Sequence, residues 1–451
     1  MSGQVYLNPS RLSILSIPRE KVWLFSSAIL KLLHQEAQQT PQSSFKPEAD
    51  FNGSLSDELL DQESDCSSVS SSYDSDDINK LTASGLSDMS ISKRNALKKN
   101  VSRTDNSSKG GPAESSTDSL TELSNEANFT DPLLVADEDH HFFHIAYTPS
   151  ECTIIAPSHT ISLLFDELLL ICQQLGYEDV ILLEKPYLNL QVDSEGEYNN
   201  SAKILELTKP LSQHNISLFF LSTHFTNIVL IPYDLKDKVI EILSENDFVF
   251  SDVSNSYILN KNFSYLAESL GIHHEQDSTT PQGTGSIKTL ADANITPQIH
   301  RKVKLLLTGA RPGEVKQSIL KASQTIAASA VPDYFAITRS SFSEISLILP
   351  GSLRQRARMG FDFRSIIGSA LDVIIPVAVD LSKLPIDSAG IVAGLASSLW
   401  DSVRSIEEPS MERFDMNYLS MARSAVVLIP QENLAVVTQM VRDMKLHLRE
   451  K

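Results

Sequence analysis

The segment 387–392, with the sequence Asp-Ser-Ala-Gly-Ile-Val, combines residue types that can bind a small anion through the backbone. It follows a strand predicted over 373–379 and opens a helix predicted over 389–403. Small side chains leave the first backbone N–H groups of a helix open, and these donors and the helix dipole attract a carboxylate. We therefore predict contacts with a free amino acid at Asp387, Ser388, Gly390, Ile391 and Val392. The alternative is a helix cap, made by Asp387 or Ser388, that holds only its own first turn.

A second group of contacts is predicted on the strand expected over 216–221. Pseudo-symmetry between the two halves of the chain would place this strand opposite segment 387–392. Its edge carbonyls could then accept hydrogen bonds from an ammonium group, and Ser217 would lie at the site. A solvent-facing position for Ser217 is the alternative.

Residues typical of catalysis or metal binding are not arranged for either function. The turn 309–314 lies between a predicted strand and a predicted helix, but it lacks the Gly-Lys-Ser/Thr ending and the full dinucleotide fingerprint. His273 and His274 have no acidic or cysteine partner at metal-ligand spacing. No Ser-His-Asp or Cys-His arrangement stands out. We expect a protein that is not an enzyme, with no catalytic residue, no metal and no cofactor.

The elements that position the predicted site come from a repeated pattern. Four apolar strand endings close on Pro157, Pro232, Pro350 and Pro430, and a helix-like segment follows each. Proline has no N–H to give a strand ladder, and its fixed φ suits the start of the next helix. Upstream of each proline the same order recurs: a short apolar strand, a helix, then a hairpin. The predicted leading strands are 11–17, 187–192 (with 180–183 as the alternative), 303–307 and 373–379, and the helices after them are 22–33, 202–211, 314–328 and 389–403.

Each repeat is therefore predicted as β-α-β-β-α, with room for a last strand such as 257–259. Units of this type form an antiparallel sheet with both helices on one face, which is an α+β fold. The other sheet face is apolar and needs a neighbour, so we expect side-by-side pairing of units.

Segment 41–137 differs from the rest of the chain. It holds 22 serines, and its 18 Asp and Glu against 8 Lys and Arg give it a formal charge of 8 − 18 = −10. Such a composition cannot bury enough apolar surface to offset ordering entropy, so we predict a disordered insertion. Ser54, Ser71, Ser115 and Ser119 each precede an acidic residue by three positions, and they are candidate phosphosites for acid-directed kinases.

Composition also restricts partners and compartment. The formal charge of −19 argues against nucleic acid or an anionic membrane as the main partner. The three cysteines, Cys66, Cys152 and Cys172, are scattered, which favours a reducing compartment. No signal-peptide pattern or membrane-spanning stretch is present, so we expect a soluble protein of the cytoplasm, in the cytosol or also the nucleus.

Short motifs in the repeats resemble those of ACT domains, the βαββαβ modules of ferredoxin-like type that bind amino acids at domain interfaces. More narrowly, the chain is similar to the CASTOR-type cytosolic arginine sensors that act upstream of the TOR growth kinase, as a fungal-like relative with a long insertion. The likeness leaves out the insertion and the linker and covers roughly three-quarters of the chain. Its motifs are 11–17 with Trp23-Leu24, 31–33, 216–223, 390–393, and 418–420 with 428–430.

The resemblance implies four tandem ACT-like units in two pseudo-symmetric halves. The units span 1–40 with 138–178, 179–265, 301–370 and 371–451, separated by the insertion 41–137 and a linker 266–300. It also implies a ligand between the second and fourth units, contacted by Ser217 and Leu218 on one side and by the backbone of Gly390, Ile391 and Val392 on the other.

The chain departs from the family where arginine would be recognised. Ala425 stands where the family presents an aspartate, Met421 replaces a threonine, and Ser388 replaces an acidic residue. A guanidinium without a paired carboxylate loses its strongest bidentate contacts, so a smaller or apolar amino acid is the better expectation. An empty pocket is one alternative, and a charge supplied by the connection 401–413, with Glu407, Glu408 and Glu412, is another.

The resulting hypothesis is a non-catalytic amino-acid sensor whose protein partner regulates the TOR pathway. The alternative is a ligand-free adaptor that uses the ACT-like units as a scaffold and the serine-rich insertion for phosphorylation-dependent protein binding. The identity of the amino acid and of the partner complex, a homodimeric state and the modified serines stay open.

Overall fold

The computed structural model describes residues 4–39, 142–193, 200–252, 293, 295–328, 331–406 and 415–449. The predictions for the insertion 41–137 with its four candidate phosphosites, for the strand 257–259, for His273 and His274, and for Glu407, Glu408 and Glu412 lie outside these residues.

The element order β-α-β-β-α occurs four times in the described residues. The first repeat contains β1 (Gln4–Pro18), α1 (Val22–Gln39), β2 (Phe143–Tyr147), β3 (Glu151–Pro157) and α2 (Ser158–Gln174). The second contains β5 (Tyr187–Asp193), α3 (Asn200–Gln213), β6 (Phe219–Ser222), β7 (Thr226–Pro232) and α4 (Lys236–Glu245). The third contains β10 (Leu305–Ala310), α7 (Val315–Ala327), β11 (Phe335–Arg339), β12 (Ile345–Pro350) and α8 (Leu353–Arg358). The fourth contains β14 (Ile374–Asp380), α9 (Ile391–Ile406), β15 (Asn417–Ser420), β16 (Ser424–Pro430) and α10 (Leu434–Arg449).

Short strands complete the sheet: β4 (Ile181–Leu182), β8 (Val249–Asp252), β9 (Gln298–Ile299) and β13 (Ile366–Ile367). Both alternatives for the second leading strand are therefore found, because β4 and β5 each pair with β1. One prediction was wrong: α9 continues to Ile406, so residues 401–406 are helix rather than connection.

The four prolines end their strands as predicted. Pro157, Pro232, Pro350 and Pro430 are the last residues of β3, β7, β12 and β16. Their φ angles are −51° at Pro157 and −55° at Pro232 and Pro430, and a helix begins at the next residue in each of these three cases. The proline ring thus sets the direction of the chain at each strand-to-helix junction.

Strands from all four repeats join one sheet, and the repeats pair crosswise. Antiparallel pairing of β2 with β11 joins the first repeat to the third, and pairing of β6 with β15 joins the second to the fourth. β1 pairs with β3 through Leu12–Pro18 and with β5 on its N-terminal side, so it belongs to both pairs of repeats. A bridge between Leu305 of β10 and Ile374 of β14 closes the path of strands on itself.

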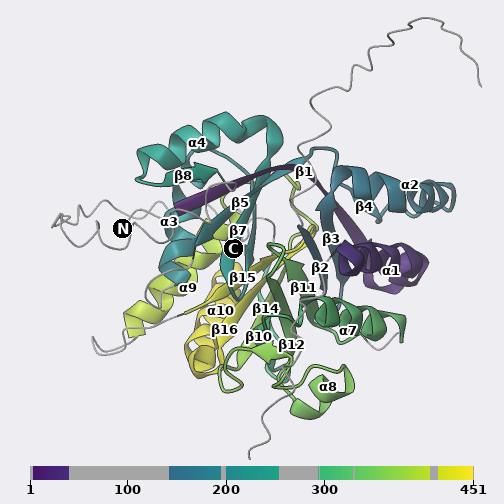
Figure 1. Cartoon of the computed structure of the whole chain (residues 1–451). Helices are drawn as coiled ribbons and strands as arrows, with labels where there is room; N and C mark the ends of the chain where they lie inside the picture. Colours follow the sequence, from purple (N-terminus) through teal and green to yellow (C-terminus); the bar gives the residue numbers. More distant parts are fainter. Residues whose placement is uncertain are drawn as a thin grey trace, which may run out of the picture. The chain divides into compact units, whose positions relative to one another are not determined.

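Three apolar clusters hold these layers together. One lies under α1, α2 and α7, and it includes Phe25, Ile29 and Ile337. A second lies under α3, α4, α9 and α10 on the other side of the strands (Figure 1). The third cluster, with Ile14, Leu221 and Leu419 among its members, fills the space between the sheet faces that carry no helix. The apolar open face predicted from the sequence is covered in this way.

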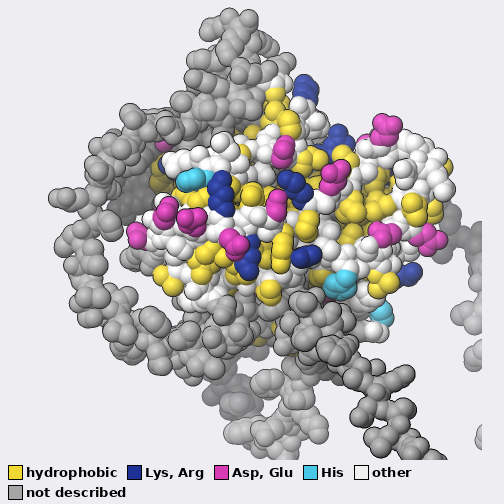
Figure 2. Space-filling view, turned by 90° about the horizontal axis from the view of Figure 1, so that it is seen from above, with side chains coloured by type: hydrophobic (Ala, Val, Ile, Leu, Met, Phe, Trp, Pro, Cys, Tyr) yellow, Lys and Arg dark blue, Asp and Glu magenta, His cyan; other side chains and the backbone are white. Residues whose placement is uncertain are grey.

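Apolar side chains also reach the surface. Figure 2 shows them among scattered acidic and basic side chains. On α2, Leu163 and Leu170 are 74% and 58% exposed, and Leu175, which follows the helix, is 54% exposed, while Phe165 of α2 is buried. Within the described ranges, no helix is long and apolar enough to cross a membrane.

Candidate functional site

The seam between β6 and β15 has a local two-fold arrangement. Leu221 pairs with Leu419 at its centre. On one side the N–H of Phe220 donates to Ser420 Oγ at 2.8 Å, and on the other the N–H of Tyr418 donates to Ser222 Oγ at 3.0 Å. Each repeat thus supplies the same hydrogen bond to the other.

Beyond this seam, the residues before each strand face the start of a helix in the partner repeat. Backbone groups of alternate residues point to the same edge of a strand. Because the Phe220 N–H points toward β15, the N–H and C=O of Leu218 point to that side as well. Neither group of Leu218 has a hydrogen-bond partner among the described residues.

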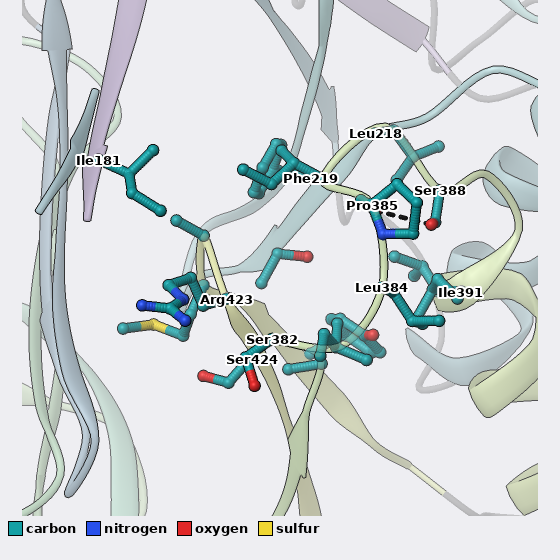
Figure 3. A pocket seen from close by; sticks show the side chains of 18 residues that line it. Ile181, Leu218, Phe219, Ser382, Leu384, Pro385, Ser388, Ile391, Arg423 and Ser424 are labelled. Atoms are coloured by element: carbon teal, nitrogen blue, oxygen red, sulfur yellow. Dashed lines mark hydrogen bonds between the residues drawn. The ribbon is translucent and has the colours of Figure 1, made fainter. Parts of the chain in front are cut away.

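A cavity of about 360 Å³ lies between the segment before β6, the start of α9, and the turn that joins β15 to β16. In Figure 3, Arg423 and Ser424 lie on one side of it, and Leu384, Pro385, Ser388 and Ile391 lie on the other. Serine hydroxyls and apolar side chains form most of its wall. The lining residues are Ile181, Leu218, Phe219, Leu381, Ser382, Leu384, Pro385, Ile386, Ser388, Ile391, Val392, Tyr418, Ser420, Met421, Ala422, Arg423, Ser424 and Ala425.

The start of α9 is shaped by glycine. Gly390 has φ +80°, a conformation that glycine adopts without strain and that stops the helix from beginning earlier. The first hydrogen bond at this end runs from Gly394 N to Gly390 O, at 2.8 Å, so the preceding N–H groups have no acceptor within the helix.

The predicted helix cap was wrong. α9 begins at Ile391, two residues after the predicted start, and Asp387 is exposed. The Ser388 hydroxyl donates to Pro385 O at 2.7 Å, which closes the preceding loop instead of capping the helix.

The structure brings most of the predicted binding residues together. Leu218, Ser388, Ile391 and Val392 line the cavity. Gly390 lines a small adjoining hollow of about 20 Å³ with Leu218. Ser217 is half-buried, and it and Asp387 adjoin lining residues without lining the cavity themselves.

Sequence reasoning missed the part of the wall formed by the β15–β16 turn. Arg423 is the one charged residue that lines the cavity, and the lining set contains no aspartate or glutamate. Ala425 is buried in the wall at the position where the family resemblance implies an aspartate. The electrostatics therefore do not favour a cationic side chain in this space.

A filled counterpart of the cavity lies at the other end of the seam. Asn200, the first residue of α3, occupies it. Its backbone N–H donates to Asp415 Oδ1 at 3.1 Å, and its side-chain amide donates to Met416 O at 3.1 Å and Asn417 Oδ1 at 2.9 Å. The Asn200 amide also lies 3.4 Å from Ser222 Oγ, and Asn227 Nδ2 donates to Asn200 Oδ1 at 2.6 Å.

The two ends of the seam correspond residue by residue. Matching Leu221 with Leu419 relates four of the five residues that hold Asn200 to residues in the wall of the cavity; the fifth, Asp415, corresponds to Ser217, which does not line it. Ser222, Asn227, Met416 and Asn417 correspond to Ser420, Ala425, Leu218 and Phe219. The chain thus places its own amide in one of two corresponding positions and has no such amide in the other. A cavity of about 600 Å³ remains open beside Asn200, lined also by Thr223, His224, Asp415 and Asn417.

Two substitutions explain the opening. Gap-free matching of Asp193 with Asp380 aligns Asn200-Ser201-Ala202 with Asp387-Ser388-Ala389 and Lys203 with Gly390. Residues 200–203 form the first turn of α3, whereas the aligned residues 387–390 are not helical, because Gly390 interrupts the helix there. Ala425 also lacks the amide that Asn227 uses to hold Asn200.

Burial perturbs the carboxyl group at the filled place. It raises the pKa of Asp415, and the hydrogen bond from the Asn200 N–H opposes that rise. The backbone donor at this helix start therefore offsets part of the free-energy cost of burying the carboxylate.

Metal and thiol chemistry have little basis in the described residues. No group of three or more His, Cys, Asp or Glu residues is arranged there to hold a metal ion. Cys152 and Cys172 are free and buried, and burial raises the pKa of both thiols. Cys66 lies outside the described residues.

Comparison with known proteins identifies one domain. An ACT domain model matches residues 182–245, which span the second repeat from β4 to the end of α4. A search of curated proteins found no match. The chain therefore contains an ACT domain, and ACT domains in general bind amino acids for regulation.

Among solved structures, a crystal structure of aspartate kinase from Synechocystis aligns with 68% of this chain and 50% of its own, at 10% identity and a TM-score of 0.24. A protein from Agrobacterium tumefaciens aligns with 30% of this chain and 91% of its own, at 12% identity and a TM-score of 0.19. The chain thus spans half the length of the kinase.

Proposed function

We propose that this ACT-domain protein is a non-catalytic sensor that binds one free amino acid in the cavity between the segment before β6 and the start of α9. All four repeats are taken as ACT-like units in this proposal, although the family model matches the second alone. The observation that carries the proposal is the filled counterpart: Asn200 and Asp415 make there the contacts that an amino acid would make in the cavity.

The backbone groups of the ligand follow from that counterpart. The carboxylate of Asp415 accepts from the first N–H of α3. The turn aligned with that N–H is not helical before α9, so the carboxylate of a bound amino acid would accept instead from the first N–H groups of α9, those of Ile391 and Val392, which have no acceptor within the helix. The Asn200 amide donates to Met416 O, so the ligand ammonium would donate to Leu218 O. A zwitterion supplies both groups at the spacing of one carbon atom.

The cavity wall indicates the class of ligand side chain. Leu381, Leu384, Pro385 and Ile386 present an apolar surface, and Arg423 would repel a second cation. A volume of about 360 Å³ admits an aliphatic amino acid, since drug-sized pockets begin at roughly 300 Å³. A neutral aliphatic amino acid therefore fits better than arginine.

The proposed output is a change in a protein-binding surface. Ligand can cause such a change only if it binds one arrangement of the repeats better than another. The partner proposed from the family resemblance is a regulator of the TOR pathway in the cytoplasm. The Asp387 side chain and the insertion phosphosites have no assigned role in ligand binding.

Thermal unfolding with each of the twenty amino acids at millimolar concentration tests this function. Binding to the folded state raises the melting temperature, and a ligand at 100 times its Kd adds about 2.7 kcal/mol of stability. We expect a rise with L-leucine or another aliphatic amino acid. Absence of a rise with every amino acid would contradict the sensor and favour the ligand-free adaptor.

A matched pair of variants separates pocket binding from general stabilisation. Gly390→Asp places a carboxylate at the α9 start, where it would repel the ligand carboxylate. Gly176→Asp is the control, because Gly176 also has a positive φ, +71°, and open space around its Cβ position. The response should vanish in the first variant and persist in the second.

A further inference from the structure

The turn between β15 and β16 separates two cavities. On one side it lines the proposed amino-acid pocket. On its other side lies a cavity of about 420 Å³, bounded by Ser16 and Glu151 of the first repeat and Asp380 of the fourth. Ser382, Arg423 and Ser424 line both. A shift of this turn would therefore change the amino-acid pocket directly.

Glu151, at the start of β3, holds this turn from the first repeat. Its side chain is buried, with 3% exposure. The Ser424 hydroxyl donates to Glu151 Oε1 at 2.6 Å, and the Arg423 N–H lies 3.3 Å from both carboxylate oxygens. The hydroxyls of Ser16 and Thr153 donate to Oε2 at 2.9 and 3.3 Å. All of these partners are donors, and an ionised carboxylate can accept from all of them.

We call the contacts of Arg423 and Ser424 with the Glu151 carboxylate the clamp. The corresponding turn of the second repeat lacks such a clamp among the described residues. There the His224 N–H donates to Ser346 Oγ at 2.8 Å, as the Ala422 N–H donates to Thr153 Oγ1 at 3.2 Å. Glu344, which corresponds to Glu151, instead accepts from Ser340 in its own hairpin at 2.9 Å. The carboxylate contact across repeats is thus present at the turn that lines the cavity and absent at its counterpart.

We infer that Glu151 is a positioning residue for the amino-acid pocket: its ionised carboxylate sets the β15–β16 turn and couples ligand binding to the first repeat. The coupling to ligand rests on the proposed function, while the clamp on the turn does not. Because coupling is reciprocal, a ligand that favours the clamped turn also favours ionised Glu151.

The coupling is sensitive to pH. Burial raises the pKa of Glu151, and the hydrogen bonds from Ser424, Ser16, Arg423 and Thr153 oppose that rise. Protonation of Glu151 would turn one carboxylate oxygen into a donor that faces other donors. The β15–β16 turn would therefore loosen as pH falls through the raised pKa of Glu151. The other titratable groups that line the cavity beside Glu151 are Glu20, Asp179, His300, Tyr334, Asp380 and Arg423.

Two measurements on the full chain test the inference. Amide hydrogen exchange of Arg423 and Ala422, without ligand, reports the clamp itself. In Glu151→Gln we expect protection of these amides to fall by about tenfold, and in Glu344→Gln, the matched control, we expect no change. Ser16→Ala removes a single donor from outside the amino-acid pocket, so it serves as a milder variant if Glu151→Gln fails to fold.

Calorimetric titration with L-leucine reports the coupling. We expect Glu151→Gln to weaken leucine binding by about tenfold. In wild type we expect leucine affinity to fall below the raised pKa of Glu151, and in Glu151→Gln this pH dependence should be absent. Glu344→Gln should match wild type in both respects. Unchanged exchange of the turn in Glu151→Gln and Ser16→Ala would overturn the clamp, whether or not leucine binds. Changed exchange without leucine binding to wild type would leave the clamp standing and count against the proposed function. Changed exchange with leucine affinity equal to wild type would overturn the coupling.

Discussion

The guanidinium of Arg339 donates to the carboxylate of Glu36 at 2.7 Å, and both side chains are buried. The pair joins the end of β11 to the last turns of α1 and so links the third repeat to the first. Burial raises the pKa of Glu36 and lowers that of Arg339, and the attraction between the two opposes both shifts. Arg339 also donates to the carbonyls of Glu36, Ser341 and Phe342, so each of its three nitrogen atoms has a hydrogen-bond partner.

Glu36→Gln should therefore lower the free energy of unfolding by about 3–5 kcal/mol, because it leaves a buried cation without its counter-charge. Urea unfolding measures the loss. Glu314→Gln is the control: it removes a more exposed partner, 3.7 Å from Lys321, and should cost at most about 1 kcal/mol. Equal losses in the two variants would contradict the role given to the buried pair.

Gly309 allows the second repeat to approach the third. A Cβ atom at this position would lie 2.5 Å from the ring of Phe225 and 2.6 Å from that of His224. Gly309→Ala should cost about 1–3 kcal/mol of stability through overpacking. Adding Phe225→Ala should recover part of the loss in urea unfolding, and strict additivity of the two changes would argue against the contact.

His144 should make the protein less stable in acid. Burial lowers the pKa of His144 to about 3, and its Nδ1 lies 2.8 Å from Thr338 Oγ1. The unfolded chain binds a proton at this residue below about pH 6.5, but the folded chain does not until about pH 3. The contribution of His144 to the free energy of unfolding is therefore fully present above about pH 6.5. Below that pH the free energy of unfolding falls by about 1.4 kcal/mol per pH unit. In His144→Gln this contribution to the slope between pH 6.5 and 5 should disappear from urea unfolding; an unchanged slope would exclude His144 as its source.

Ala425→Asn should close the amino-acid pocket. The new amide would take the place that Asn227 has at the filled end of the seam. Stabilisation by L-leucine should be lost in thermal unfolding, while the melting temperature without ligand stays within a few degrees of wild type. Ala357→Asn, at an exposed position on α8 that does not line the pocket, is the control. A full leucine response in Ala425→Asn would contradict the placement of the ligand.

The repeated elements could be predicted because their signals are local. Apolar period and strand-ending proline are read from a few neighbouring residues, as at Leu230-Ile231-Pro232, and these strands and helices are found. Which repeats pair is not a local property, since β2, β6, β11 and β15 are all short apolar strands able to pair at an edge. Contacts specific to the crosswise order, such as that of Arg339 in the third repeat with Glu36 in the first, have no pattern in either segment by itself.

The predicted site was incomplete for the same reason. Ile391 and Val392 were predicted from the helix-start pattern and Leu218 from the family resemblance, whereas Arg423, Ser424 and Glu151 act through a turn whose neighbours lie in other repeats. One signal was available in the sequence. When the second and fourth repeats are aligned, the two amide residues Asn200 and Asn227 match Asp387 and Ala425, so the fourth repeat lacks both amides. The unwound turn before α9 could not be read from sequence, because Gly390 is compatible with several backbone conformations.

Both pairs of repeats depend on the strand β1. Its fifteen residues hydrogen-bond along one part with β3 and along another with β5, and β8 adds alongside. Neither pair of repeats can therefore be excised as an autonomous fragment, because any cut removes an inner strand from at least one of them. A fragment that kept only the second and fourth repeats would leave one edge of β5 without its partner strand.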